Sequence, residues 1–298
     1  MPRVRHIALI FTSLAAVLPA FGAEGKGLEP MAHPMFHVGP LPVSNSIVMT
    51  WIVAIVLIIA IRIVVGSPKL VPSHGQAIVE SLVTGIKDIV DPIVGSKAIK
   101  ATFPLLIALF TYILIQNWSG LIPGVGTIMM RHGTAGEWME FVRPAHSDMN
   151  GTIALSFCAF IAGLILVLRF AGIKTVLVDV FGNKATKGDV SPFVYYPLSI
   201  IFVAVGVLEL VSIFFARPIS LSFRLYGNIF GGENLLHSMS AICRWGLPVP
   251  FYFMELLVGL VQAFVFTLLI AVYVGLLTNH GDGHAEAAGK DQPHGAHH

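Results

Sequence analysis

Long runs of apolar residues, separated by short polar segments, dominate this chain. An α-helix rises about 1.5 Å per residue, so about 20 consecutive apolar residues cross the hydrocarbon core of a membrane. Runs long enough to do so occupy residues 45–66, 101–123, 150–171, 194–245 and 249–278. The pattern predicts an all-α integral membrane protein with a single membrane domain over residues 45–278.

Residues 73–98 show a different pattern, in which apolar positions recur at helical spacing and charged residues interrupt them. Ile78, Leu82 and Ile86 lie four residues apart and share one face, whereas Lys87 lies on another. This arrangement is typical of an amphipathic helix that lies at the membrane interface.

The run 194–245 is much longer than one upright span requires. Pro218 is the only proline between Pro197 and Pro248. A single helix over 198–245 would measure about 72 Å, more than twice the hydrocarbon thickness, so it would have to tilt steeply. Two spans that turn at Arg217-Pro218 remain an alternative.

The two ends of the chain differ from the membrane domain. Residues 1–23 combine a basic start, an apolar stretch and small residues before position 24, which predicts a signal peptide; an uncleaved first helix is the alternative. Residues 24–44 are rich in Pro, Gly and His and are interpreted as an exported strap. Residues 279–298 are polar and predicted to be a disordered tail.

Lysines indicate the orientation of the chain in the membrane. Four of them flank or occupy the amphipathic segment: Lys69, Lys87, Lys97 and Lys100. Positive charge gathers on the cytoplasmic side of membrane proteins. Together with the exported start, this bias predicts a bacterial inner-membrane protein with a periplasmic N-terminus and a cytoplasmic C-terminus.

Composition agrees with lipid as the main solvent. Only 11% of the residues are charged, against about 25% in soluble domains, and the mean hydropathy is +0.82. The net charge of +2 and the lack of a basic cluster argue against nucleic acid as a partner. Cys158 and Cys243 lie in apolar runs and are expected to be buried free thiols. No phosphate-binding loop, metal site or cofactor site is predicted.

Five charged residues stand out inside the last two apolar runs, away from their ends: Glu209, Arg217, Arg224, Glu233 and Glu255. A charge in mid-bilayer costs about 2.5–3.5 kcal/mol on insertion scales, so each one needs a functional or a pairing explanation. Structural ion pairs within the bundle are one such explanation; a hydrated path for ions is the other.

Helical geometry separates Arg224 from Glu233. Arg217, Arg224 and Asn228 share one stripe of a helix. Glu233, nine residues beyond Arg224, lies on the opposite face about 13 Å along the axis and is no local partner for it. Arginine keeps its proton at any accessible pH, whereas a buried glutamate can relay protons.

The last apolar run repeats the combination of acid and amide. Glu255 and Gln262 are seven residues apart and share a face. Gly227 and Gly231 carry no side chain, so another helix can approach the preceding helix closely there. The alternative is that these glycines serve packing alone.

These residues belong to a longer match. The stretch from Arg217 to Glu233, RPISLSFRLYGNIFGGE, closely resembles the signature helix of subunit a of F-type ATP synthases. Four further motifs resemble the same family: Asn117-Trp-Ser-Gly-Leu-Ile-Pro-Gly124, Pro72-(x)3-Gln76-(x)3-Glu80, Asp148-Met-Asn150 and Glu255-(x)6-Gln262. The resemblance runs in order from about residue 45 to 278.

The resemblance implies three upright transmembrane helices, one interfacial helix and a long tilted helical hairpin that cups a rotating ring of c subunits. It implies that Arg224 faces the ring carboxylate. The residues it implies along the exported-side half-channel are Glu233, Asn228, Glu255 and Gln262, with Asp148 and Asn150 as candidates for its mouth.

The resemblance also implies a non-catalytic subunit that forms two half-channels and couples ion flow to rotation. Its partners would be the c-ring, the subunit b stalk, other ATP synthase subunits and the lipid bilayer. The transported ion would be the proton, with Na⁺ left open.

The chain departs from the family pattern at three places. Glu255 stands where some relatives have histidine, the outer loop has one extra residue (His146 or a neighbour), and Glu209 is displaced by one position. An ion-coupled secondary transporter is the alternative function, because broken helices and buried charges suit it. A haem protein would need paired histidines in the membrane, and only His237 lies in an apolar run.

Overall fold

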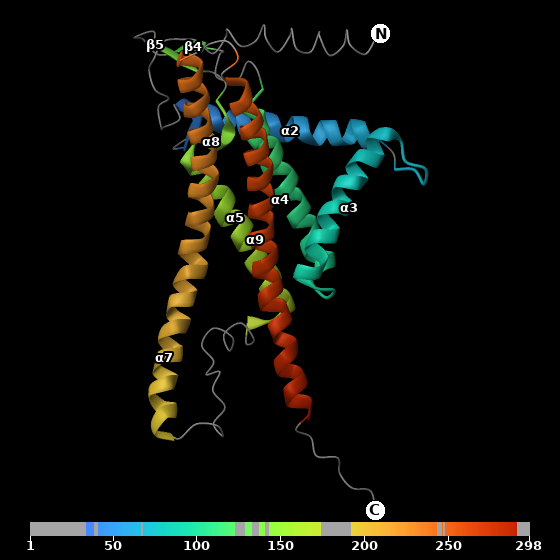
Figure 1. Cartoon of the computed structure of the whole chain (residues 1–298), viewed down its shortest axis with the longest axis vertical. Helices are drawn as coiled ribbons and strands as arrows, with labels where there is room; N and C mark the ends of the chain where they lie inside the picture. Colours follow the sequence, from blue (N-terminus) through green and yellow to red (C-terminus); the bar gives the residue numbers. More distant parts are fainter. Residues whose placement is uncertain are drawn as a thin grey trace, which may run out of the picture. The chain divides into compact units, whose positions relative to one another are not determined.

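The computed structural model of the chain describes residues 34–38, 41–66, 68–122, 129–132, 137–140, 143–173, 192–242, 246 and 248–290 (Figure 1). The predicted signal peptide, residues 1–23, lies outside the described residues. So do the first part of the strap, residues 24–33, and the end of the tail, residues 291–298.

Helices dominate the described residues. They are α2 (Asn45–Val65), α3 (His74–Val94), α4 (Ile99–Ser119), α5 (Met149–Phe170), α7 (Pro192–Val211), α8 (Arg217–Ile242) and α9 (Pro248–Lys290). Within the described ranges, five helical stretches are long and apolar enough to cross a membrane: Asn45–Val65, Ile99–Ser119, Met149–Phe170, Val203–Ile242 and Pro248–Thr278. The prediction of an all-α integral membrane protein is therefore confirmed.

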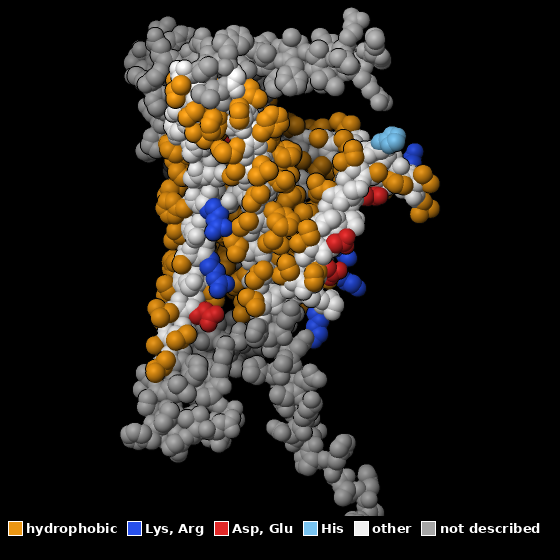
Figure 2. Space-filling view, in the orientation of Figure 1, with side chains coloured by type: hydrophobic (Ala, Val, Ile, Leu, Met, Phe, Trp, Pro, Cys, Tyr) orange, Lys and Arg blue, Asp and Glu red, His pale blue; other side chains and the backbone are white. Residues whose placement is uncertain are grey.

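On the face that Figure 2 shows, hydrophobic side chains cover most of the described helices, with a few charged side chains among them. On α2, the side chains of Ile55, Ile58 and Ile63 are 57%, 60% and 75% exposed. Water would penalise an apolar surface of this extent, whereas lipid tails accept it. Helix α2 therefore presents a face suited to lipid.

The chain does not turn at Pro218. Helix α7 is followed directly by a π-helical turn, Ser212–Ala216, and then by α8, which Figure 1 draws as one continuous ribbon. A proline ring clashes with the carbonyl four residues earlier in a regular α-helix. The backbone N–H of Arg217 bonds instead to the carbonyl of Ser212, five residues earlier. This wider turn lets the helix pass Pro218 unbroken.

Helix α9 follows after Gly246, whose φ of 91° lies in the left-handed region that favours glycine. The helix extends to Lys290, twelve residues past the predicted end at 278. Of residues 279–290 the structure describes only the backbone, which continues as helix where the sequence predicts a disordered tail.

Helix α3 is capped and ended by local signals. The side chain of Ser73 accepts a hydrogen bond from the Gln76 N–H at 3.3 Å, and Gln76 donates to Glu80 at 2.7 Å. Gly95, with φ of 82°, follows the last residue, Val94. The helix thus ends four residues before the predicted limit of 98.

Two short hairpins were not predicted. Strand β1 (Pro34–Val38) pairs antiparallel with β2 (Leu41–Ser44), in the segment interpreted as the strap. Strand β4 (Met129–His132) pairs with β5 (Glu137–Glu140) between α4 and α5. Each hairpin forms only a two-stranded sheet.

The chain divides into two compact units. Unit 1 takes its described residues from Met1–Ser67, Thr111–Ala154 and Ser222–Phe264. Its packing includes an apolar cluster of Met49, Val53 and Ile115. It also includes a hydrogen bond from the Gln116 amide to the Thr50 carbonyl.

Unit 2 takes its described residues from Pro68–Phe110, Leu155–Leu221 and Val265–His298. Aromatic contacts hold it together: the ring of Phe160 lies 4.8 Å from that of Tyr273 and 6.3 Å from that of Phe214. Gly275 packs so closely on the Ile93 carbonyl that a Cβ there would collide with it. Lipid-embedded helices approach one another at such small residues.

Candidate functional site

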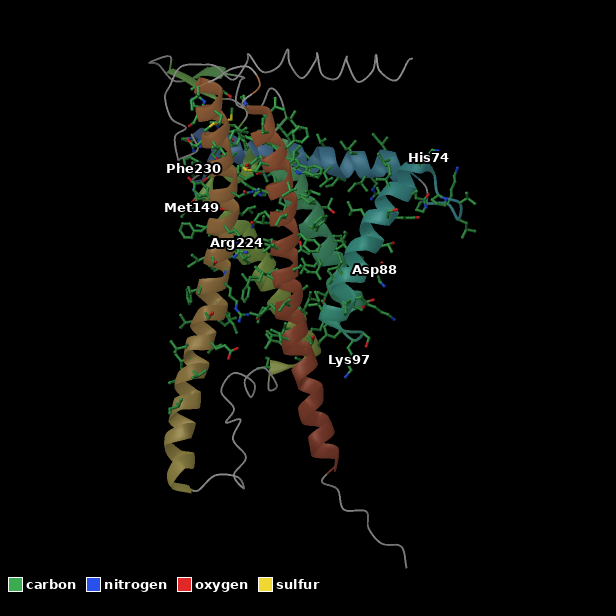
Figure 3. All side chains as sticks on the ribbon, viewed as in Figure 1. His74, Asp88, Lys97, Met149, Arg224 and Phe230 are labelled. Atoms are coloured by element: carbon green, nitrogen blue, oxygen red, sulfur yellow. The ribbon has the colours of Figure 1, made fainter. Side chains whose placement is uncertain are left out.

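Helix α8 has a buried face and an open face. Leu225, Ile229 and Leu236 are 0%, 4% and 8% exposed and share the buried face. Arg224 is exposed (Figure 3). An added Cβ at Gly227 or Gly231 would meet nothing within 4 Å. Arg224 therefore stands beside a small-residue surface that the described residues leave uncovered.

Arg224 has no acid partner in the described part of the chain. Lys87 and Asp91, for comparison, form an ion pair 3.2 Å apart on the exposed side of α3. The nine-residue spacing to Glu233 gives no reason to expect a pair within α8 for Arg224. Its guanidinium is thus available to a group outside these residues.

The other arginine of this helix behaves differently. The guanidinium of Arg217 lies 5.8 Å from the centre of the Tyr273 ring, which comes from α9. A cation over an aromatic face is stabilised by the ring quadrupole. Two turns apart on one stripe, Arg217 has an intramolecular partner of this kind and Arg224 has none among the described residues.

Glu255 and Gly232 meet where α9 packs on α8. Glu255 is 6% exposed. Its carboxyl group occupies the space that a side chain at position 232 would fill, because an added Cβ there would collide with the carboxyl carbon and both oxygens. Glycine at this position therefore admits the carboxyl. The resemblance in the sequence groups Glu255 with Glu233, whereas the neighbour of Glu255 in the structure is Gly232.

Two amides of the predicted path point into buried space. Nδ2 of Asn228 on α8 and Nε2 of Gln262 on α9 are buried and have no hydrogen-bond partner among the described residues. Buried polar groups without a protein partner are the groups that ordered water satisfies. Both amides are suited to a hydrated path.

Asp148 has a defined structural role at the start of α5. Its Oδ1 accepts a hydrogen bond from the Asn150 N–H at 3.1 Å, the geometry of a helix N-cap. Its Oδ2 accepts from the hydroxyls of Ser46 at 3.1 Å and Ser44 at 3.4 Å. Asp148 is 7% exposed, and Asn150 lies on the surface.

A chain of buried polar contacts joins the loop between α4 and α5 to α9. His146, in the 3₁₀ turn η2 (Ala145–Ser147), places Nδ1 3.1 Å from Oδ1 of Asn117 on α4. The amide of Asn117 donates to the Gly259 carbonyl at 3.0 Å. His146 and Asn117 are 3% and 2% exposed, and burial lowers the pKa of His146 to about 3. The imidazole is therefore neutral.

The sequence motifs assign no role to this chain of contacts. Asn117 appeared only in a motif and His146 only as an extra loop residue. They are 29 positions apart, and Gly259 is 142 positions from Asn117. The sequence signal for these contacts is that Asn117 and His146 are polar residues next to apolar spans.

Cys158 has a free thiol as predicted, but it is exposed rather than buried, because it lies on the outer side of α5. Cys243 lies outside the described residues. Glu209 is half-buried in α7 before the π-helical turn, and nothing in its surroundings assigns it a role.

Comparison with known proteins agrees with the resemblance in the sequence. A family model described as ATP synthase A chain matches residues 47–275. ATP synthase subunit a of Gloeobacter violaceus is 33% identical over 85% of this chain and 92% of its own length. Subunit a of Moorella thermoacetica is 29% identical over 80% of this chain and 93% of its own length. The chain spans most of its relatives and belongs to the ATP synthase A chain family, whose members are membrane-sector, proton-translocating subunits of ATP synthase.

Proposed function

We propose that this chain is the stationary subunit that forms two half-channels against a c-ring and couples ion flow to rotation, with Arg224 facing the ring carboxylate. The observation that carries the proposal is the position of Arg224. It stands exposed on a stretch, Val203–Ile242, suited to crossing a membrane, without an acid partner in the described part of the chain.

The positive charge of Arg224 requires a counter-charge from outside the described residues. A cation at bilayer depth costs about 2.5–3.5 kcal/mol unless it is paired or hydrated. The uncovered positions Gly227 and Gly231 lie on the side of Arg224 and admit another helix at close range. A carboxylate on a neighbouring subunit's helix is the partner that fits both features.

The half-channel from the exported side is assigned to Glu233, Asn228, Glu255 and Gln262. The buried amide nitrogens of Asn228 and Gln262 support a wet path, and a buried carboxyl at Glu255 can exchange a proton with it. Asp148 and Asn150 remain candidates for the mouth of this path. The capping role of Asp148 is compatible with that position, because Asn150 beside it is exposed.

The proton would reach the ring from one side of the membrane and leave it toward the other. It enters from the exported side, moves through the Glu233 and Glu255 region, and neutralises a ring carboxylate, which then rotates through lipid at low cost. A protonated ring carboxyl that completes the rotation reaches the cytoplasmic half-channel beside Arg224, which stabilises the ionised form and so favours release of the proton toward the cytoplasmic side. The fixed cation also repels protons that would leak straight across. Each proton crossing 100 mV supplies about 2.3 kcal/mol.

The setting follows from the same proposal. The chain would lie in a bacterial inner membrane, with its N-terminus in the periplasm and its C-terminus in the cytoplasm. It would bind the c-ring, the subunit b stalk and other ATP synthase subunits. It would perform no ATP chemistry itself. It would carry protons, and an assay at controlled Na⁺ distinguishes proton transport from Na⁺ transport.

The test replaces Arg224 by alanine in the intact complex and measures ATP-driven acidification of inverted vesicles at controlled Na⁺. We expect pumping to be abolished while the c-ring still co-purifies with the chain. Arg217→Ala is the matched control, since Arg217 lies on the same stripe but stacks on Tyr273, and it should retain most pumping. Normal pumping by the Arg224 variant would refute the role.

A further inference from the structure

The outer loop is fastened to α4 and α9 next to the acid and amide of the proposed path. His146 contacts Asn117 through Nδ1 and meets the Tyr112 ring edge-on at 6.3 Å between ring centres. Two positions before His146, Pro144 packs on Gly120, where an added Cβ would lie 3.1 Å from the proline ring. All of these residues belong to unit 1.

The contact with α9 falls on one turn of that helix. Asn117 donates to the Gly259 carbonyl, and the neighbouring Trp118 donates its ring N–H to the Leu256 carbonyl at 3.1 Å. An added Cβ at Gly259 would lie 3.2 Å from the Cβ of Asn117. Glu255 is one helical turn before Gly259, so this contact determines where its carboxyl stands.

The hydrogen bonds also determine the form of the imidazole. Asn117 uses its NH₂ group on the Gly259 carbonyl, so the amide oxygen faces His146. An amide oxygen only accepts, so Nδ1 of His146 must be the donor. The chain therefore runs in one direction, from His146 through Asn117 to α9.

We propose that His146 is a positioning residue for proton uptake: through Asn117 it holds the α9 turn that carries Glu255, so that the carboxyl stays against Gly232. The inference rests on the proposed function, in which Glu255 lines the exported-side half-channel. Between lipid-embedded helices there is no hydrophobic driving force to fix rotation, so such polar contacts and close glycine packing set it.

The test uses the intact complex in vesicles and two readouts. The first is passive proton flux through the membrane sector after the peripheral head has been removed. The second is the infrared C=O band of protonated Glu255, identified by its loss in Glu255→Gln. His146→Ala should lower the flux about tenfold, the factor expected for one interhelical hydrogen bond, and should shift the Glu255 band.

Two conservative variants sharpen the test. Asparagine places its amide nitrogen near the position of Nδ1, whereas glutamine places it near Nε2. His146→Asn should therefore restore flux and band, and His146→Gln should not. Tyr112→Phe keeps the ring contact with His146 but removes the hydrogen bond between its hydroxyl and Gln116, so it controls for the loss of a neighbouring hydrogen bond and should change neither readout.

A double-mutant cycle tests the route through Asn117. If His146 acts through Asn117, adding His146→Ala to Asn117→Ala should cause no further loss of flux. Additive losses, an unmoved Glu255 band in His146→Ala, or failure of both His146→Ala and His146→Asn to assemble would each overturn the inference. Normal pumping by Arg224→Ala would overturn the proposed function instead, while the Glu255 band would still decide on the positioning.

Discussion

The carboxyl group of Glu255 on α9 lies in the space above Gly232 on α8 that any larger residue would fill. Helix α9 supplies the carboxyl group, and the glycine on α8 leaves the space that this group occupies. This pairing explains why two glycines, Gly231 and Gly232, stand side by side in α8 with different surroundings: the first faces open space and the second faces Glu255.

Gly232→Ala should displace the Glu255 carboxyl and lower passive proton flux through the membrane sector. The colliding atoms are the flexible end of the Glu255 side chain, so the protein should still assemble while the acid moves away from its place in the proposed path. Glu255→Asp, which is shorter by one methylene, should recover part of the flux in the Gly232→Ala background. Gly85→Ala in α3 is the control, because nothing lies within 4 Å of an added Cβ there. Equal flux in Gly232→Ala and the unmodified complex would contradict the proposed packing.

Asp148 allows its capping role to be separated from a role at the mouth of the half-channel. Asp148→Ala should lower the unfolding free energy by about 1–3 kcal/mol, because it removes the cap and the acceptor of Ser44 and Ser46. Asp148→Asn keeps an oxygen acceptor without the charge. Thermal unfolding in detergent measures the first effect. If Asp148→Asn is stable yet conducts fewer protons, the charge belongs to the path; if flux is unchanged, only the cap matters.

The buried imidazole of His146 predicts acid sensitivity. Its folded-state pKa of about 3 lies below the ordinary value of 6.5, so the unfolded chain binds the extra proton first as pH falls. Above about pH 7.5 the imidazole is neutral in both states and does not reduce the free energy of unfolding. This free energy decreases as the pH falls through 6.5, because protonation then favours the unfolded chain. By linkage, the loss at pH 5.5 should be about 1.4 kcal/mol.

Urea unfolding of the chain at several pH values, followed with spectroscopic probes placed in unit 1, checks this expectation. The groups around His146 that also carry charge or titrate are Tyr112, Arg143 and Asp148, so variants at those positions serve as comparisons. His146→Asn should flatten the profile between pH 7.5 and 5.5. A profile that keeps its slope in that variant would assign the acid sensitivity to another group.

Arg217 and Tyr273 form a contact whose two components are separable by mutation. The Tyr273 hydroxyl is buried without a hydrogen-bond partner among the described residues, so Tyr273→Phe should be neutral or stabilising. Tyr273→Leu removes the ring and should cost at least the cation–π contribution of about 0.5–2 kcal/mol. Melting temperatures of the solubilised complex distinguish the two. The same loss from Phe and Leu would show that the hydroxyl, and not the ring under Arg217, stabilises the contact.

Sequence patterns predicted the helices well where lipid imposes a simple rule. The span at 45–66 is observed at Asn45–Val65 and that at 150–171 at Met149–Phe170, because a backbone in hydrocarbon has to satisfy its own hydrogen bonds. The alternative of a turn at Pro218 was settled by the π-helical turn before it. No feature of the local sequence announces an i to i+5 hydrogen bond.

The roles proposed for Arg224 and Glu255 rest on residue type, spacing and resemblance, since a charge in an apolar run requires an explanation from the sequence alone. Their surroundings did not. That Gly232 makes room for Glu255, that Asn117 joins His146 to Gly259, and that Arg217 stacks on Tyr273 depend on contacts between segments far apart in the chain. Hydropathy and helical periodicity are local quantities and specify which residues enter the membrane. Rotation and close approach of one helix on another depend on side-chain shape at both partners, so only the tertiary structure decided them.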